Sequence, residues 1–270
     1  MDTHINEIPI ILNSENADVV TDNGSSFTVN LNESIRVPDD SDMCWVKLLN
    51  ATIPNTNPNI ITGTNDLLHF SWDNGGGPTA ELITFPEGIY DIDSINDEIT
   101  RQVTVIDSSL VGTFQFFGNE ATQKAILVIN TSGGKPAVTI DFVTDYDQSI
   151  GPLLGFEAVS YPFATNTKAE VSAPNTARIN STEFFLVHCD LVDQGIRFNN
   201  TYSQILGRII IDDAAGSTIV HRPYNIPKIM AKRLIGNYKT NIHVWLTDQN
   251  NVLVNTSGEN YTISVVINYI

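Results

Sequence analysis

Along most of the chain apolar residues alternate with polar ones, and clusters of Gly, Pro, Asn and Asp separate the alternating stretches. In "SSFTVNLN", Phe27, Val29 and Leu31 fall on one side of an extended chain, a pattern typical of a half-buried strand. The final stretch repeats this alternation at Tyr261, Ile263, Val265, Ile267 and Tyr269. The pattern predicts many short β-strands joined by turns.

The apolar period changes in "FPEGIYDIDSINDEI", residues 85–99. From there apolar residues recur at helical spacing, at Ile92, Ile95, Ile99 and Val103. Asp91 or Ser94 is placed to cap the start, and acidic residues in the first turn favour a helix. One amphipathic helix is therefore predicted here. Pro152 and Gly155 in "GPLLGF" predict a second, short helix.

The order of these elements indicates the fold class. Strands do not alternate one for one with helices, which argues against a parallel α/β sheet. We predict an all-β, antiparallel jelly-roll β-sandwich with one or two short helices. Residues 1–24 lack sustained periodicity and are expected to form an N-terminal arm. Residues 25–270 are expected to form a single domain, with an insertion at about residues 80–170.

The charge of the chain restricts its partners. Lys and Arg number 14 against 31 Asp and Glu, a formal net charge of −17. Because phosphate binding needs clustered Lys and Arg, no direct nucleic acid binding is expected. The first twenty residues lack a basic segment, and the apolar run at 8–12 is too short for a signal sequence. No stretch approaches a membrane span, so we expect a chain made and kept in the cytosol.

The sequence contains no recognisable catalytic or cofactor-binding motif. The five histidines show no H-x-H or H-E-x-x-H spacing, and no nucleophile elbow, Walker loop or dinucleotide motif is present. Cys44 and Cys189 have no metal-ligand spacing and are expected to be buried thiols. We predict no enzymatic activity, no catalytic residues and no cofactor.

Four carboxylates leave two interpretations open. Clustered near the ends of two predicted late strands are Asp190, Asp193, Asp212 and Asp213. Such loop carboxylates are the ligands that Ca²⁺ prefers. The interpretation that we favour is a solvated acidic rim that keeps the protein soluble.

Several motifs in a fixed order resemble the penton, or minor capsid, proteins of virophages and of the related Polinton/Maverick elements. They are "FTVNLNESIRVP", "CWVKLLNATIPNTNPNI", "FPEGIYDIDSINDEI", "TIDFVTDYDQSIGPLLGF" and the closing "HVWLTDQNNVLVNTSGENYTISVVINYI". The resemblance covers roughly residues 25–270. It implies a single jelly roll that forms homopentamers at icosahedral vertices and contacts a double jelly-roll major capsid protein. It also implies a place in the virion, at the capsid vertex, after synthesis in the host cytoplasm or virus factory.

Loops carry partner contacts in most β-sandwiches. We therefore expect subunit contacts in the N-terminal arm and in the loops "NATIPNTNPNI" and "NNTYSQ", at Asn55, Asn57, Asn59, Asn199, Asn200 and Tyr202. The alternative is a carbohydrate- or receptor-binding, lectin-like β-sandwich. In that case Trp45, Trp72 and Trp245 would stack on sugar rings.

Overall fold

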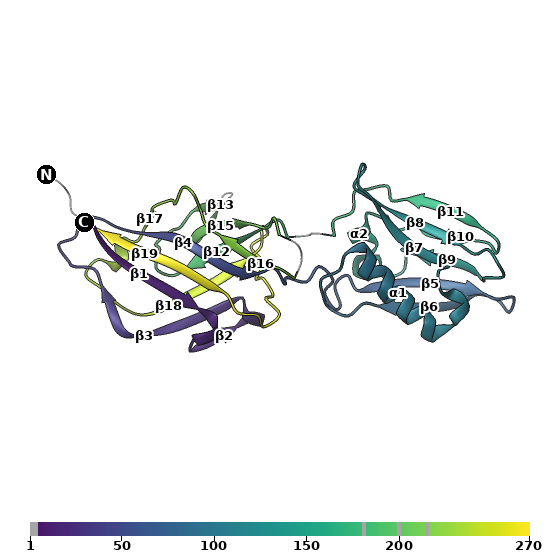
Figure 1. Ribbon diagram of the computed structural model, residues 1–270, viewed down its shortest axis with the longest axis horizontal. Helices are drawn as coiled ribbons and strands as arrows, with labels where there is room; N and C mark the ends of the chain where they lie inside the picture. Colours follow the sequence, from purple (N-terminus) through teal and green to yellow (C-terminus); the bar gives the residue numbers. More distant parts are fainter. Residues whose placement is uncertain (1–4, 180–181, 199–200, 214–215) are drawn as a thin grey trace. The chain divides into compact units, whose positions relative to one another are not determined.

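The computed structural model of the protein describes residues 5–179, 182–198, 201–213 and 216–270. The chain forms two compact units (Figure 1). Unit 1 comprises Met1–Asn57 and Thr182–Ile270, and unit 2 comprises Pro58–Ser181. Unit 2 is thus inserted between the two halves of unit 1, and each unit has a hydrophobic core of its own.

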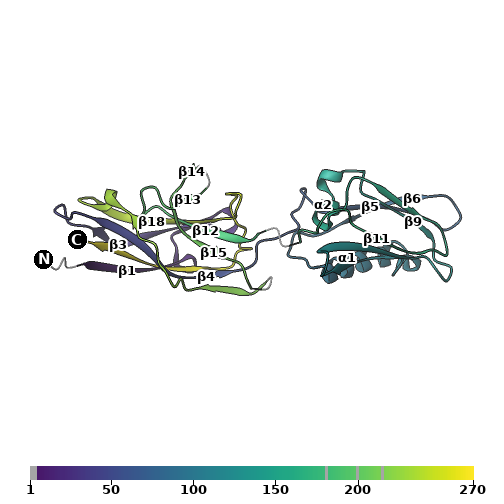
Figure 2. The same ribbon diagram turned by 90° about the horizontal axis from the view of Figure 1, so that it is seen from above.

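Unit 1 contains two antiparallel sheets, each ordered here from edge to edge. Sheet I consists of β1 (Asn6–Asn13), β19 (Thr262–Tyr269), β4 (Cys44–Pro54) and β16 (Thr218–His221), with β17 (Ile229–Met230) also paired to β4. Sheet II consists of β15 (Ile205–Ile210), β12 (Phe184–Cys189), β18 (Tyr238–Thr247), β3 (Ser26–Arg36) and β2 (Val19–Thr21). A hairpin of β13 (Arg197–Phe198) and β14 (Thr201–Tyr202) lies beside β12 and β15 (Figure 2).

The strand order of unit 1 is that of a jelly roll. Its eight principal strands are, in chain order, β1, β3, β4, β12, β15, β16, β18 and β19. Sheet I holds the first, eighth, third and sixth of these, and sheet II holds the second, seventh, fourth and fifth. This is the pattern of two interlocked Greek keys. The prediction of an all-β, antiparallel jelly roll with few helices is confirmed.

The first strand corrects the expectation of an N-terminal arm at residues 1–24. β1 pairs with β19 over its whole length, from Asn6 opposite Tyr269 to Asn13 opposite Thr262. Leu12 is buried, and Ile8 and Ile10 pack against the core. β2 then joins the edge of sheet II beside β3. Apolar burial on one face of β1 holds this segment in the sandwich.

The alternation predicted for the last strand is present in β19. Ile263, Val265 and Ile267 are fully buried in the core of unit 1. Cys44 and Cys189 are free thiols in the same core, which confirms the expectation of buried cysteines. Burial raises the pKa of Cys44 to about 11 and that of Cys189 to about 12, so both remain protonated and unreactive at neutral pH.

Unit 2 is a second sandwich of two antiparallel sheets. Sheet III consists of β10 (Ser160–Phe163), β9 (Ala137–Asp141), β5 (Leu67–Asp73) and β6 (Thr79–Thr84). Sheet IV consists of β11 (Lys168–Ser172), β8 (Lys124–Asn130) and β7 (Phe114–Asn119). This unit spans the range 80–170 suggested for an insertion and extends beyond it at both ends.

The predicted amphipathic helix is α1 (Ile92–Ile106). Asp91 is its N-cap: the carboxylate accepts the backbone N–H of Ser94, whose hydroxyl accepts the backbone N–H of Asp91. Ile95, Ile99 and Val103 are buried in the core of unit 2. The second helix is α2 (Gly151–Leu154), which Gly155 ends in the left-handed conformation at φ 82°. Within the described ranges, no helix has the length and apolar content to cross a membrane.

The remaining elements are short 3₁₀ turns. They are η1 (Ser14–Asn16), η2 (Asp22–Gly24), η3 (Ser108–Leu110), η4 (Tyr146–Gln148) and η5 (Lys232–Leu234). The turn η5 lies between β17 and β18 and positions the basic side chains described next.

Candidate functional site

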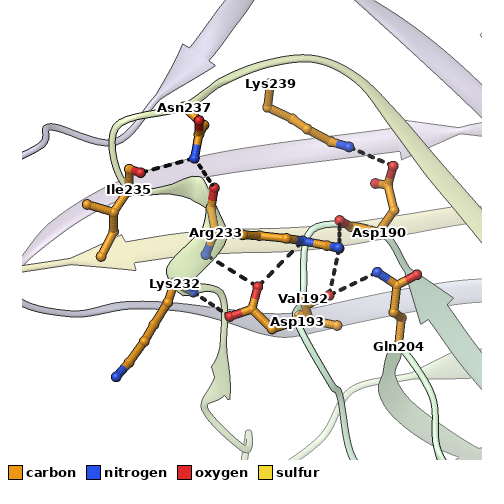
Figure 3. Close-up of polar contacts among 9 residues, drawn as sticks. All are labelled: Asp190, Val192, Asp193, Gln204, Lys232, Arg233, Ile235, Asn237 and Lys239. Carbon is orange, nitrogen blue, oxygen red and sulfur yellow. Dashed lines mark hydrogen bonds and ion pairs between the residues drawn. The ribbon is translucent and has the colours of Figure 1, made fainter.

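A cluster of ion pairs surrounds Asp190 and Asp193, in the loop that follows β12 (Figure 3). The Lys239 Nζ lies 2.6 Å from the Asp190 Oδ2, and the backbone N–H of His243 donates to the Asp190 Oδ1 at 3.1 Å. The Asp193 carboxylate accepts the backbone N–H of Lys232 at 2.7 Å and lies 3.5 Å from the Arg233 Nε. Each carboxylate therefore already has a cationic partner from the same chain.

The Arg233 guanidinium joins the same loop to η5. It donates to the carbonyl oxygens of Asp190 and Val192, the latter at 2.7 Å. A surface depression of about 260 Å³ opens beside it, lined by Asp190, Arg233, Leu234, Asn237, Tyr238 and Lys239. The charged groups of this depression are paired with one another, so the cluster fastens a loop to a turn rather than offering open ligands.

The structure does not bring the four predicted metal ligands together. β12 and β15 are antiparallel, with Phe184 opposite Ile210 and His188 opposite Ile205. Asp190 follows the end of β12, whereas Asp212 and Asp213 follow the end of β15. Because the two strands are antiparallel, Asp190 lies at one end of this strand pair and Asp212 and Asp213 at the other. A strand rises about 3.3 Å per residue, so these ends are about 20 Å apart. Among the described residues, no group of three or more His, Cys, Asp or Glu side chains could hold a metal ion. The prediction that these four carboxylates could form one cation site is therefore wrong.

Two histidines of sheet II stack on Trp245. The ring centroid of His188 lies 4.9 Å from that of Trp245, and the centroid of His243 lies 4.8 Å away on the same strand. The His188 ring bonds the hydroxyls of Thr247 at 2.9 Å and Ser203 at 3.2 Å. Burial lowers the pKa of His188 to about 4, so it is neutral at pH 7.

A serine–histidine contact also occurs in this histidine row, the stack formed by His188, Trp245 and His243. The Ser26 Oγ lies 2.8 Å from the His243 Nε2. Asp190 bonds the backbone N–H of His243 and not its ring, so the acid that orients the histidine of a catalytic triad is not supplied by this neighbour. The contact serves sheet packing.

The tryptophans do not favour the lectin alternative. Trp245 is stacked against two histidine rings. Trp45 is 4% exposed, and the Lys228 Nζ lies over its ring at 4.7 Å. Trp72 packs against the core of unit 2. A sugar ring needs an open aromatic face, and these three are engaged within the protein.

The predicted contact residues have different surroundings. The Asn55 Nδ2 donates to the carbonyl of Asp213 at 3.1 Å, and Asn57 bonds the Thr182 hydroxyl and the Asn255 backbone. Asn59 is buried: its amide donates to the carbonyls of Tyr90 and Ile179 and accepts the backbone N–H of Tyr90.

These bonds hold loops in place, so a partner contact through the Asn59 side chain is not available. The contacts expected at Asn55 and Asn57 stay a prediction. Asn199 and Asn200 lie outside the described residues, as does the side chain of Tyr202.

Unit 1 exposes apolar side chains on two opposite edges. The N-terminal flank consists of β1 and β2 with Ile5, Ile11, Val19 and Val20, and Ile11 is 75% exposed. The opposite flank, named the G-side flank because β16 takes the place of strand G in a jelly roll lettered B to I, consists of β16, β17 and the segment between them. Its exposed apolar side chains are those of Val220, Tyr224 and Met230, and Val220 is 54% exposed. β1 and β16 are the two ends of sheet I. Apolar side chains along open sheet edges are typical of contact surfaces.

The comparisons with known proteins add one structural likeness. No protein-family model matches the chain. No curated protein matches it. Among solved structures, the selenomethionine-labelled crystal structure of the mavirus penton protein is similar. It is 10% identical, with 99% of this chain and 100% of that chain covered and a TM-score of 0.49. These values are too low to carry a function to this chain.

Two amides on α1 were not anticipated from the sequence. Asn96 donates to the carbonyl of Phe116 at 2.7 Å and accepts its N–H at 2.8 Å. Gln102 bonds both backbone groups of Thr84 in the same way, at 2.7 and 3.2 Å. Asn96 at the edge of β7 and Gln102 at the edge of β6 thus form the backbone hydrogen bonds that a neighbouring strand would otherwise form. Their positions beside the apolar stripe of α1 are the signal that was available in the sequence.

Proposed function

We propose that this protein is a viral structural protein, a penton or minor capsid subunit that forms homopentamers at icosahedral vertices. The observation that carries the proposal is the pair of open, apolar flanks on the jelly roll of unit 1. Subunits in a ring meet through two different faces, so a ring-forming chain needs two such surfaces.

The order of the sequence motifs supports the same assignment. The segment 85–99 forms a turn and the helix α1, and the closing stretch forms the strands β18 and β19. The resemblance of these motifs to penton proteins implies a capsid-vertex position beside a double jelly-roll major capsid protein. The net charge of −17 agrees with a subunit that contacts protein and not the genome.

The site chemistry supports a structural role over catalysis. In the described part of the chain, the ion-pair cluster fastens a loop and the histidine row packs a sheet. Both cysteines are buried. The proposed role is therefore assembly, without a chemical step.

Negative-stain electron microscopy of the purified full-length protein tests the proposal. Class averages with fivefold symmetry would support a penton. Particles with twofold or threefold symmetry, or single chains at every concentration, would overturn it. Incubation with trimers of a double jelly-roll major capsid protein would then test the vertex contact, which should appear as a co-sedimenting complex.

A further inference from the structure

The two flanks of unit 1 differ in charge as well as in position. Residues 5–35, which form β1, β2 and most of β3, contain no Lys or Arg. Their exposed carboxylates are those of Glu7, Glu15, Asp18, Asp22 and Glu33. Every charged side chain that this segment itself contributes to the N-terminal flank is therefore negative.

The G-side flank has the opposite sign. Residues 218–232, which run from β16 to just beyond β17, contain three basic residues and no Asp or Glu. Arg222 follows β16, Lys228 precedes β17 and Lys232 follows it, and all three side chains are exposed. Asp212 and Asp213 precede β16, at the far end of that strand from Arg222.

The cations of this flank are available to a partner. Arg233 and Lys239 are paired with Asp193 and Asp190. Arg222, Lys228 and Lys232 make no ion pair within the described ranges. In Figure 3 the Lys232 side chain points away from the ion-pair cluster. Lys228 lies over Trp45, which holds its charge at the flank.

We propose that the acidic N-terminal flank of one copy docks against the basic G-side flank of the next copy, head to tail. This inference rests on the proposed function and names the surfaces that make the ring. Two copies with a net charge of −17 repel each other overall, so close contact requires local complementarity of this kind. The topology supplies it, because β1 and β16 are opposite ends of one sheet.

The arrangement is heterologous and consistent with a closed ring. Each copy has one acidic and one basic flank. When every copy is related to the next by the same rotation, both flanks of each copy are in contact with a neighbour. Apolar side chains on each flank form the centre of the contact, and the charges form its rim. High salt screens the rim and weakens the contact.

Charge reversal tests the inference in the full-length protein. We expect Lys232→Glu and Glu15→Lys each to weaken self-association at least ~10-fold in sedimentation velocity at low ionic strength. The matched controls are Lys168→Glu and Glu170→Lys, two exposed positions on β11 of unit 2 that change the net charge equally. These controls should associate as the wild type does.

A chain carrying both Lys232→Glu and Glu15→Lys has its flank charges exchanged, so association should return towards the wild-type level. Rescue also excludes misfolding as the cause of the single-variant defects. Fivefold rings that survive both single reversals unchanged would overturn the head-to-tail contact and leave the proposed function standing. A wild-type chain that stays monomeric at low ionic strength would overturn both.

Discussion

The two sandwiches of this chain treat their open sheet edges in different ways. In unit 2, α1 lies along β6 and β7, and the amides of Asn96 and Gln102 bond the exposed backbone groups of both strands. In unit 1 no helix longer than a 3₁₀ turn is present within the described residues, and β1, β2 and β16 keep free edges with exposed apolar side chains.

This difference explains why a β-rich chain contains one well-marked amphipathic helix. An unpaired strand edge is a template for pairing with another chain, so it must be covered or used. Unit 2 covers two of its four edge strands, β6 and β7, with a helix that also buries Ile95, Ile99 and Val103. Unit 1 leaves β1, β2 and β16 open along their outer edges. We therefore assign the proposed self-association to unit 1.

The largest expected effect comes from placing a charge on an open flank. Ile11→Lys puts an ammonium group at an exposed position of β1. Loss of apolar burial and desolvation of the charge should weaken self-association about 100-fold, or about 3 kcal/mol. The melting temperature should change little, because Ile11 is already solvent-exposed in the single chain.

Val105→Lys is the matched control, since Val105 is 82% exposed on α1 of unit 2. Analytical ultracentrifugation of both variants decides the comparison. Equal weakening by both substitutions would contradict the assignment of assembly to unit 1.

Acid should destabilise unit 1 through His188. The pKa of His188 is about 4 in the folded chain, below its ordinary value, so the unfolded chain takes up the proton first. Stability is therefore lost as the pH falls from about 6.5 to about 4, by about 3 kcal/mol from this group. Calorimetry across this range should show the unit 1 transition moving to lower temperature.

His188→Gln should remove this part of the pH dependence. His69→Gln, in unit 2, should leave the unit 1 transition with the wild-type slope. If the His188→Gln protein retained the full acid sensitivity, the burial argument would be wrong.

Opening an edge of unit 2 should have a smaller effect. Asn96→Ala leaves the N–H and the carbonyl of Phe116 without their side-chain partner, at a cost of about 2 kcal/mol to the stability of unit 2. Asp97→Ala, at the next and exposed position of α1, controls for the change in helix propensity and should cost less than about 0.5 kcal/mol. Urea unfolding of both variants measures the difference, and equal losses would show that the amide does not stabilise the edge.

The smallest effect is expected at the cap of α1. Side-chain and backbone hydrogen bonds from Ser94 lower the pKa of Asp91. Asp91→Ala should destabilise unit 2 by about 1 kcal/mol, and Asp91→Asn should restore most of the loss because the amide oxygen still accepts the Ser94 N–H. Thermal unfolding at pH 7 compares the three proteins, and identical melting temperatures would contradict the capping role.

Local patterns predicted local elements well. The helical period and the capping residues placed α1, and strict alternation placed β19, because both signals depend on neighbours in the chain. The short run at 8–12 was missed as a strand, since its partner β19 lies at the other end of the chain. Only that pairing gives the run a buried face.

Strand pairing also explains why the acidic residues at 190–193 and 212–213 do not cluster as predicted. Asp190 and Asp212 both follow late strands, and proximity to a strand end suggested proximity in space. The antiparallel register of β12 and β15 sends the two ends apart. The edge amides escaped notice for a related reason, because the partners of Asn96 and Gln102 are backbone groups, which carry no sequence signal.

Hydrogen–deuterium exchange of the assembled and the dissociated protein would show which unit makes the contacts between subunits. We expect assembly to protect residues 6–21 and 218–232, the two flanks of unit 1, and to leave exchange in α1 and at the edges of β6 and β7 unchanged. Protection confined to residues 58–181 would contradict this expectation, because unit 2 would then make the contacts between subunits.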